Sequence, residues 1–245
     1  MTSHCRCIDF KFPGLPHIGC AFTTRAVSPR ASRQQTADAF QTALDTDLQD
    51  LQGRNRIQSR QSVHQVHGST LLFVEHSPET GREKADALAT GRTSLALVIR
   101  TADCQPILMS DRSGRCIAAL HVGWRGNRNE VLLQWVKEFC AHFGLRPHEL
   151  VAVRGPSLSP ARSEFVHFAR EWGSDFLPYF KAEHQTVDLW RLTRDQLLRA
   201  GLLREHVFGL DLCTYSLPEL FYSYRRDRDI GRQAGIIWID QSGAM

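Results

Sequence analysis

The chain has 245 residues, of which 42% are hydrophobic and 23% charged, a balance typical of a globular protein with a large core in one domain or in two closely fused halves. Its formal net charge is only +4, and no run of basic residues precedes Tyr224, Arg225 and Arg226. This charge pattern does not indicate a nucleic-acid-binding surface, and it is equally compatible with a small anionic substrate.

The cysteines and the N-terminus indicate the compartment. No stretch reaches the length and apolarity of a membrane span, and no targeting segment is visible. The seven cysteines are an odd number, spread from Cys5 to Cys213, which favours reduced thiols over a disulfide framework. We therefore expect a cytoplasmic protein that binds neither membranes nor nucleic acid.

The N-terminal part of the chain predicts three strands and one helix. Residues 18–25 read as an early strand that ends in a polar loop, and residues 36–51 have apolar side chains near a helical period. Residues 62–68 alternate like a strand, and residues 71–74 continue it after a break at Gly68. On such a strand His64 and His67 point to opposite faces, so only one can serve a site. His67 abuts the glycine and is the better candidate, although a surface histidine is about as common.

Two apolar runs in the middle of the chain bring a thiol and an imidazole together. Residues 95–99 predict a strand buried on both faces, and residues 115–120 predict the next one, with a turn at residues 111–114 between them. In an antiparallel pair, Cys104 at the exit of the first strand lies near His121 at the end of the second, if the register allows it. Such a pair can bind a metal or act as nucleophile and base. Asp103 and Arg125 flank the pair, where a plain core would have apolar neighbours.

A helix over residues 127–143 follows, with one apolar stripe, Asn127 or Asn129 as N-cap and Gly144 past its end. The segment from Gly123 to Gly126 precedes it, and its free N–H groups together with Arg125 favour an anion. The remaining elements are predicted in chain order: strand 150–156, helices 163–172 and 192–200, strand 207–214 and strand 234–239. Residues 221–227 combine aromatic rings with guanidinium groups, which suits either a base-stacking platform or a solvated loop.

Several short motifs occur in a fixed order along the chain. They read QVHG at 65–68, ADAL at 85–88, TADC at 101–104, HVGWRG at 121–126, GPS at 155–157, CT at 213–214, YSYRR at 222–226 and GR at 231–232. The ordered set resembles the YfiH-type laccase-domain proteins, also called the polyphenol oxidase or purine nucleoside phosphorylase family. The likeness extends over roughly residues 62–240. It implies an α+β fold, with residues 1–245 as a single domain built as a layered α/β/β/α sandwich with mixed sheets.

The resemblance also implies a metal and a reaction. A zinc ion would be held by His67, Cys104 and His121, with copper as the alternative metal. Three protein ligands leave one position open, as in catalytic zinc sites. The implied chemistry is phosphorolysis of purine nucleosides such as adenosine or inosine, with adenosine deamination and methylthioadenosine cleavage as companion activities. The implied partners are a small purine nucleoside and phosphate, taken by a monomer or weak oligomer.

The other site residues are assigned more loosely. Asp103 and Arg125 join the three ligands as candidate catalytic residues. The candidate residues for substrate or anion binding are Asp86, Gly123, Gly126, Arg225 and Arg232. Three departures from the family pattern concern the shaping of the substrate site: residues 26–29 lack the usual glycine pair, Gln105 replaces an apolar residue, and of a Cys-Cys-Tyr-Glu segment only Glu164 survives.

Other classes of protein remain possible on the sequence. A multicopper laccase needs several His-x-His pairs, and the sequence contains none. Cys104 as nucleophile with His121 as base would make an amide hydrolase acting on peptidoglycan precursors. A metal-binding module without catalysis is a third alternative.

Overall fold

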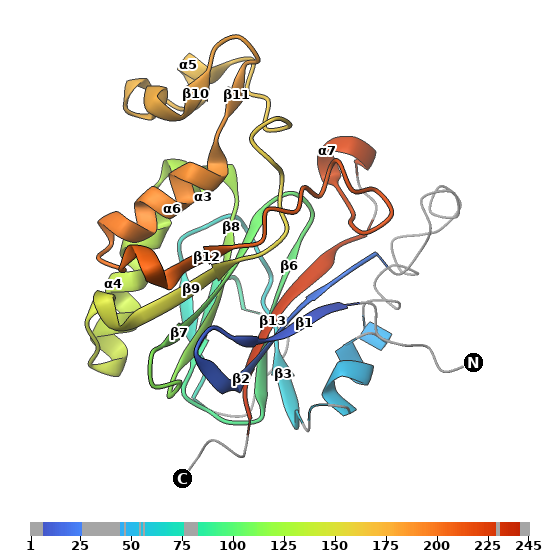
Figure 1. Ribbon diagram of the computed structural model, residues 1–245, viewed down its shortest axis with the longest axis vertical. Coiled ribbons are helices and arrows are strands. Elements are labelled where there is room, and N and C mark those ends of the chain that lie inside the picture. Colours follow the sequence, from blue (N-terminus) through green and yellow to red (C-terminus); the bar gives the residue numbers. More distant parts are fainter. Residues whose placement is uncertain are drawn as a thin grey trace.

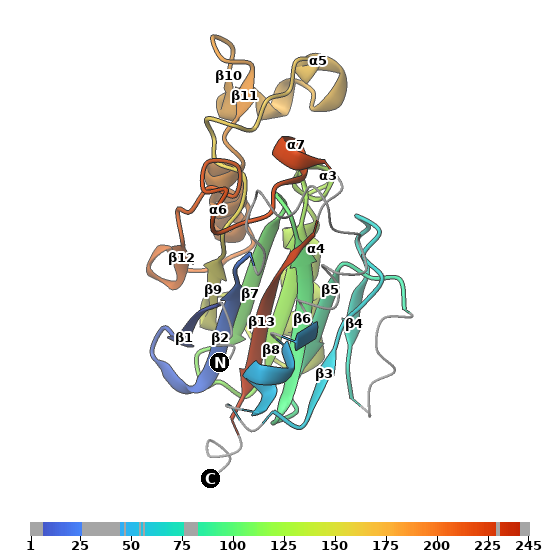
Figure 2. The same cartoon turned by 90° about the vertical axis from the view of Figure 1, so that its right-hand side faces the viewer.

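Two β-sheets packed face to face form the centre of the molecule. The computed structural model describes residues 7–25, 45–46, 48–53, 55, 57–75, 83–228 and 231–240. Helices cover both outer faces, so that the layers run helix, sheet, sheet, helix (Figures 1 and 2). This is the α+β sandwich with mixed sheets that the resemblance implied. In the described part of the chain, no helix combines the length and apolar character needed to cross a membrane.

The first sheet has five strands. Their order is β1 (Cys7–Phe12), β2 (Leu15–Thr23), β13 (Gln233–Ile239), β6 (Leu95–Thr101) and β3 (Ser59–Gln61). All neighbours are antiparallel except β3, which runs parallel to β6. The apolar run in β6 is buried on both faces as predicted, because Leu97 and Ile99 point into the space between the sheets while Ala96 and Val98 face the outer helix.

The second sheet has six strands and carries most of the site. Their order is β12 (Val207–Gly209), β9 (Leu150–Arg154), β7 (Gln105–Asp111), β8 (Ile117–Val122), β5 (Ala87–Thr90) and β4 (Leu71–Phe73). The two outermost pairs are parallel and the inner pairs antiparallel. The predicted pairing of residues 95–99 with residues 115–120 is wrong, because β8 pairs with β7 and β6 lies in the other sheet.

Apolar side chains fill the three interfaces between the four layers. Residues such as Leu97, Leu108 and Ile117 pack between the sheets. Trp135 and Phe139 of α4 (Val131–Phe143) pack on the outer face of the six-stranded sheet. On the other side, Leu48 and Leu51 come from the helical residues 45–46 and 48–53, which end the predicted helix 36–51. The earlier part of that prediction, residues 36–44, lies outside the described residues.

The helix predicted over residues 127–143 is interrupted. The short α3 (Trp124–Arg128) ends at Asn129, and Glu130 takes a left-handed conformation with φ of 53° before α4 begins. Neither predicted asparagine caps α4, because its N-cap is Glu130. The C-terminal expectation is confirmed: Gly144 has φ of 66°, which glycine adopts without strain.

A smaller module stands above one end of the sandwich (Figure 1). It holds α5 (Phe168–Glu171), the 3-10 helix η2 (Ser174–Tyr179) and the hairpin of β10 (Phe180–Lys181) and β11 (Thr186–Val187). The helix predicted over 163–172 is thus reduced to one turn. The remaining elements are α6 (Leu189–Arg199), α7 (Tyr224–Asp227) and the 3-10 helices η1 (Pro147–Glu149) and η3 (Arg204–His206).

Candidate metal centre

Three separate segments bring His67, Cys104 and His121 together. Cys104 immediately precedes β7, and His121 lies near the end of β8, where it pairs with Pro106 across the ladder. The expected approach of thiol and imidazole therefore occurs, with β7 as the partner strand. One ligand atom from each of the three residues lies within 4.8 Å of the others, and Sγ of Cys104 is 3.8 Å from Nε2 of His67.

His67 reaches this point through a tight loop rather than a strand. Residues 62–68 do not form the predicted strand, and His67 has a left-handed φ of 57°. The buried carboxylate of Asp86 holds the loop by accepting hydrogen bonds from the backbone N–H groups of Val66, His67 and Gly68, at 3.1, 2.9 and 2.7 Å. These three hydrogen bonds offset the strain of a non-glycine residue at positive φ.

Asp86 also orients His121. Its Oδ1 accepts a hydrogen bond from Nδ1 of His121 at 2.7 Å, which leaves Nε2 of the ring as the free ligand atom. Although the burial of Asp86 works in the opposite direction, hydrogen bonds from His121 and from the backbone hold the pKa of this carboxyl below its usual value. Asp86 is fully buried. It lies beneath the centre and does not line the cavity, so it positions ligands instead of touching substrate.

The thiol of Cys104 is ionised near neutral pH. Burial by itself would raise its pKa, but the imidazoles of His121 and His67 outweigh that effect and lower the pKa to about 6. Burial of His121 favours its neutral form, yet the charge of Cys104 and the hydrogen bond to Asp86 raise the pKa of His121 to about 9. The centre is therefore a place where a thiolate is stabilised by positive charge.

These residues fit a divalent metal ion such as zinc. Thiolate sulfur and imidazole nitrogen are the donors that zinc prefers, and tetrahedral coordination at the usual bond lengths separates sulfur and nitrogen by about 3.5 Å, close to the 3.8 Å between Cys104 and His67. The hydrogen bond from His121 to Asp86 supplies the outer carboxylate that zinc-bound histidines commonly have. In the described part of the chain, this is the one cluster of three such side chains.

The two glycines of the segment 123–126 serve close packing. A Cβ atom on Gly123 would lie 2.9 Å from Cδ2 of His67 and 3.2 Å from Sγ of Cys104. A Cβ atom on Gly126 would lie 3.2 Å from Cγ2 of Val131. Gly123 therefore leaves room for two of the ligands, and Gly126 allows α3 to approach α4.

Asp103 connects three segments around the centre. It has a positive φ of 88°. Its Oδ1 accepts from the Thr214 hydroxyl and its Oδ2 from the backbone N–H of Arg225, each at 2.7 Å, while its carbonyl accepts from the N–H of Leu158 at 3.0 Å. The residue just before Cys104 is thereby fixed to the loop after β9, to the segment of Thr214 and to α7.

A cavity of about 1050 Å³ opens over the metal centre. His67, Cys104 and His121 lie in its wall, and Asp103 lines it as well. Six arginines line it: Arg100, Arg125, Arg162, Arg225, Arg228 and Arg232. The three arginines predicted for the site are thus all present. Three that sequence reasoning missed, Arg100, Arg162 and Arg228, belong to no motif, so only the fold could reveal them.

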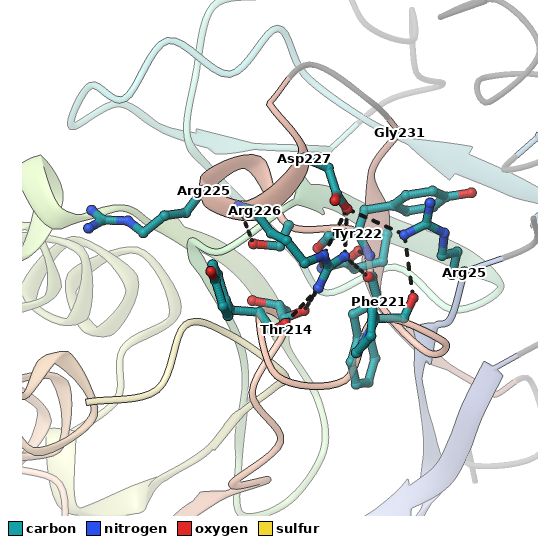
Figure 3. A network of polar contacts seen from close by, with 12 residues as sticks. Arg25, Thr214, Phe221, Tyr222, Arg225, Arg226, Asp227 and Gly231 are labelled. Carbon is teal, nitrogen blue, oxygen red and sulfur yellow. Dashed lines mark hydrogen bonds and ion pairs between the residues drawn. The ribbon is translucent and has the colours of Figure 1, made fainter. Parts of the chain in front are cut away.

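Residues 214–227, called the strap below, are held together by a network of polar contacts (Figure 3) and carry Arg225, which lines the cavity. The guanidinium of Arg226 donates to the carbonyls of Thr214 and Tyr215, each at 2.7 Å, to that of Phe221 at 2.8 Å, and to Asp227. The buried Arg25 also pairs with Asp227, at 3.4 Å. Arg225 projects away from this network (Figure 3) and donates to the carbonyl of Glu164 at 2.6 Å. The predicted aromatic platform is therefore partly replaced by a structural ion-pair network.

This fold and site define an α+β protein in which a His–Cys–His cluster that could hold a metal ion lies in the wall of an arginine-lined cavity. The chain belongs to the laccase-domain family: the family model described as multi-copper polyphenol oxidoreductase laccase matches residues 31–240. A protein of Escherichia coli named purine nucleoside phosphorylase YfiH is 32% identical over 185 residues, which are 72% of either chain. A Xylella fastidiosa protein named purine nucleoside phosphorylase is 36% identical over 188 residues, covering 72% of this chain and 71% of the relative.

Solved structures show the same fold. The crystal structure of a Neisseria meningitidis protein matches with a TM-score of 0.78 and 26% sequence identity, covering 96% of this chain and 99% of that one. A Bacillus licheniformis protein titled hypothetical protein YfiH matches with a TM-score of 0.77 at 21% identity, over 91% and 93% of the two chains. The sandwich is thus retained where little of the sequence is shared.

Proposed function

We propose that this protein is a metal-dependent purine nucleoside phosphorylase that converts adenosine or inosine and phosphate to the free base and ribose 1-phosphate. The single observation that carries the proposal is the position of the His67–Cys104–His121 centre in the wall of a cavity lined by arginines. The names of the relatives in Escherichia coli and Xylella fastidiosa support the same reaction. We further propose that the enzyme acts as a monomer or weak oligomer.

In phosphorolysis a phosphate oxygen forms a bond to C1′ of the ribose. The bond from C1′ to the purine nitrogen breaks, and the base leaves with that electron pair and takes up a proton. The dianionic phosphate must be held against a sugar carbon that becomes electron-poor, which is the task of fixed cations. Arg125, which lies over the ring of Trp124, and Arg225, which lies over that of Phe165, are suited to this task because both line the same cavity as His67, Cys104 and His121.

The purine base requires a flat, apolar contact. Trp124 and Phe165 line the cavity with their ring centroids 5.6 Å apart, and Trp172 packs behind both rings. Aromatic faces of this kind bind purines by stacking. Placing the base there would direct the ribose toward the ligands of the metal centre.

In this proposal His67, Cys104 and His121 hold a zinc ion, with copper as the alternative. When bound, such an ion supplies a Lewis acid that polarises a substrate oxygen or a water molecule. Asp86 keeps His121 in the tautomer that ligation needs, and Asp103 keeps the segment of Cys104 in place. The proposal extends to two companion activities, adenosine deamination and methylthioadenosine phosphorolysis, since both use the same purine contacts.

Metal analysis combined with a nucleoside panel tests the proposal. Purified protein should contain about one zinc or copper ion per chain and should release base from adenosine, inosine or methylthioadenosine only with phosphate present. Deamination of adenosine should continue without phosphate. Removal of the metal by a chelator should abolish turnover, and zinc should restore it. A metal-loaded protein that turns over no nucleoside under these conditions would contradict the proposal.

A Cys-nucleophile amide hydrolase is the second candidate, because Cys104 lies within 4.8 Å of His121 and His121 is hydrogen-bonded to Asp86. The pKa of Cys104 is about 6, burial notwithstanding, because of its histidine neighbours, and the 2.7 Å hydrogen bond to Asp86 orients His121. Peptidoglycan precursors are the proposed substrates for this reaction. A nucleophilic thiolate would keep its activity in the presence of chelator and lose it on alkylation. A thiolate that serves as a metal ligand would lose activity with chelator.

A further inference from the structure

Arginine–aromatic pairs divide into two groups according to where they lie. In the described part of the chain, seven guanidinium groups lie within 6.0 Å of the centroid of an aromatic ring. The three pairs in which the arginine lies outside the cavity over the metal centre are each completed by a carboxylate. These are Arg25 on Tyr222 with Asp227, Arg154 on Trp190 with Asp211, and Arg191 on Tyr179 with Asp195.

The other four pairs line the cavity and lack a carboxylate. They are Arg125 on Trp124 at 4.4 Å, Arg162 on Tyr215 at 4.9 Å, Arg225 on Phe165 at 5.5 Å and Arg228 on Tyr224 at 6.0 Å. Among the described residues, none of these four arginines forms a salt bridge with an acidic side chain. The two carboxylates in the cavity wall belong to Asp103 and Glu164, and that of Asp103 accepts from Thr214 and from the backbone of Arg225.

Stacking on a ring restricts a guanidinium group without using its N–H donors. A salt bridge both fixes the group and neutralises it, as happens at the three pairs outside the cavity. The four arginines paired with rings in the cavity are restrained in orientation but keep their charge for a ligand, and, toward residues that the structure describes, only Arg225 uses one of its donors, on the carbonyl of Glu164. A planar guanidinium group with free donors is suited to bidentate contacts with phosphate oxygens.

The number and distribution of these arginines exceed what one inorganic phosphate uses. Arg125 is on α3, Arg162 is on the loop after β9, and Arg225 and Arg228 are at the beginning and just past the end of α7. The volume of the cavity, about 1050 Å³, is slightly above the range of roughly 300–1,000 Å³ for small-molecule sites. The cavity therefore has room for a nucleoside, the attacking phosphate and a further anionic group.

We propose that the preferred ligand of this cavity is a purine nucleotide, a nucleoside whose ribose carries its own phosphate group, with Arg162 and Arg228 as the residues that recognise it. The inference rests on the proposed purine specificity of the site and deepens it. Arg125 follows His121 by four residues, and the backbone of Arg225 is hydrogen-bonded to Asp103, the neighbour of Cys104. These two arginines therefore hold the attacking phosphate, and Arg162 and Arg228 are left for the phosphate ester.

Calorimetric titration of the metal-loaded full chain with adenosine, AMP, ADP and pyrophosphate tests the inference. AMP and ADP are expected to bind at least tenfold more tightly than adenosine at 0.15 M salt. Arg162→Gln and Arg228→Gln are each expected to reduce AMP affinity on the order of tenfold, since one charge-assisted hydrogen bond to phosphate is worth about that much. The metal content of each variant shows that its site is still assembled.

The control variant is Arg112→Gln. Arg112 is exposed at the far end of β7, opposite Cys104, and is outside the cavity, so the substitution removes the same charge without touching the ligand. It should leave AMP affinity within twofold of that of the unaltered protein. Equal loss in Arg112→Gln and Arg162→Gln would show that only overall charge matters and would overturn the inference.

The remaining outcomes are also decisive. Equal affinity for adenosine and AMP would overturn the inference, and so would pyrophosphate binding as tightly as ADP, because the nucleoside would then add nothing. Failure of the proposed reaction is seen separately, in the phosphate-dependent release of base from adenosine. If AMP bound tightly through Arg162 and Arg228 but no base were released, a purine nucleotide would remain the preferred ligand. The proposed phosphorylase reaction would be contradicted.

Discussion

The carboxylate of Asp86 joins His67 and His121, two residues of the candidate metal centre that are far apart in the sequence. It accepts a hydrogen bond from Nδ1 of His121 at 2.7 Å and, through the same oxygen, one from the backbone N–H of His67 at 2.9 Å. One buried side chain thus sets the ring orientation of one ligand and the backbone conformation of the other. Geometry of this kind holds the donors in place before a metal ion arrives.

Replacement of Asp86 should therefore weaken metal binding. In Asp86→Asn the side-chain amide can accept fewer hydrogen bonds than the carboxylate, which takes one from His121 and three from the backbone. We expect metal affinity to fall about 10–100-fold, measured by competition with a chromophoric chelator. An unchanged zinc affinity would show that Asp86 does not position the ligands.

The control is a carboxylate with a similar structural role far from the centre. Asp111 is buried at the other end of β7 and accepts hydrogen bonds from the backbone N–H groups of Ser113, Arg115 and Cys116. Asp111→Asn should lower stability by about 1–3 kcal/mol, measured by urea denaturation, and leave metal affinity unaltered. The contrast separates loss of positioning from general destabilisation.

The reactivity of Cys104 should follow an unusually low pKa. In the metal-free protein burial opposes ionisation, but the adjacent His121 and His67 lower the pKa of Cys104 to about 6. The thiolate is the nucleophile, so the rate of alkylation by iodoacetamide should rise through pH 6 and level off by about pH 7. By contrast, burial raises the pKa of Cys140 to about 11. Mass spectrometry of the peptide that contains Cys104 measures this profile.

The control for that experiment compares alkylation of Cys104 in the presence and absence of bound zinc. Zinc held by Cys104 should protect the thiol, so alkylation at pH 7 should slow at least tenfold when one equivalent is added. The variant Cys104→Ser reports how much label the other cysteines take up. A midpoint near pH 9, the ordinary value for a thiol, would contradict the charge arrangement around Cys104.

Elements that are marked by a local residue pattern, such as an apolar run or a glycine at a helix end, were predictable from the sequence. The run over 95–99 is apolar on both faces because it lies between two layers, and Gly144 ends α4 in the conformation that glycine favours. The approach of Cys104 and His121 was predicted through the wrong strand pair, because the apolar part of β7 is short and follows Gln105 and Pro106. Which strand pairs with β8 is decided by tertiary packing, which periodicity does not encode.

The features of the site that the sequence did not predict depend on contacts between residues far apart in the chain. Alternation predicted a strand at His67, but the left-handed loop is imposed by Asp86, which comes later in the chain. Asp103 and Arg225 are joined only when α7 reaches the loop before β7. No sequence motif contains Arg162 or Arg228, and only the fold places them on Tyr215 and Tyr224.

Gly123 should tolerate no side chain. Its φ of −81° is open to any residue, so the constraint is steric: a Cβ atom would lie 2.9 Å from the ring of His67 and 3.2 Å from the sulfur of Cys104. Gly123→Ala should displace both ligands and reduce metal affinity at least tenfold. Gly68→Ala is the control, since its Cβ atom would meet neighbours only at ordinary contact distances of 3.5 and 3.6 Å. Equal metal content in the two variants would contradict this role of Gly123.

Arg226 should act on catalysis through its neighbour Arg225. The Arg226 guanidinium binds three backbone carbonyls and Asp227 (Figure 3), a set of contacts that lysine cannot reproduce from a single ammonium group. In Arg226→Lys the strap should loosen and Arg225 should lose its fixed position, so KM for phosphate should rise about tenfold with a smaller change in kcat.

The control for Arg226→Lys is Arg199→Lys, which alters an exposed ion pair of 2.6 Å with Glu130 and should change neither constant. Steady-state phosphorolysis of inosine at varied phosphate measures both variants. If Arg226→Lys lowered kcat and left KM for phosphate unchanged, the strap would not be holding a phosphate-binding arginine. The lower kcat would then reflect the chemical step. Asp103 accepts a hydrogen bond from the N–H of Arg225 and precedes Cys104, so a displaced Arg225 would disturb the segment that carries Cys104.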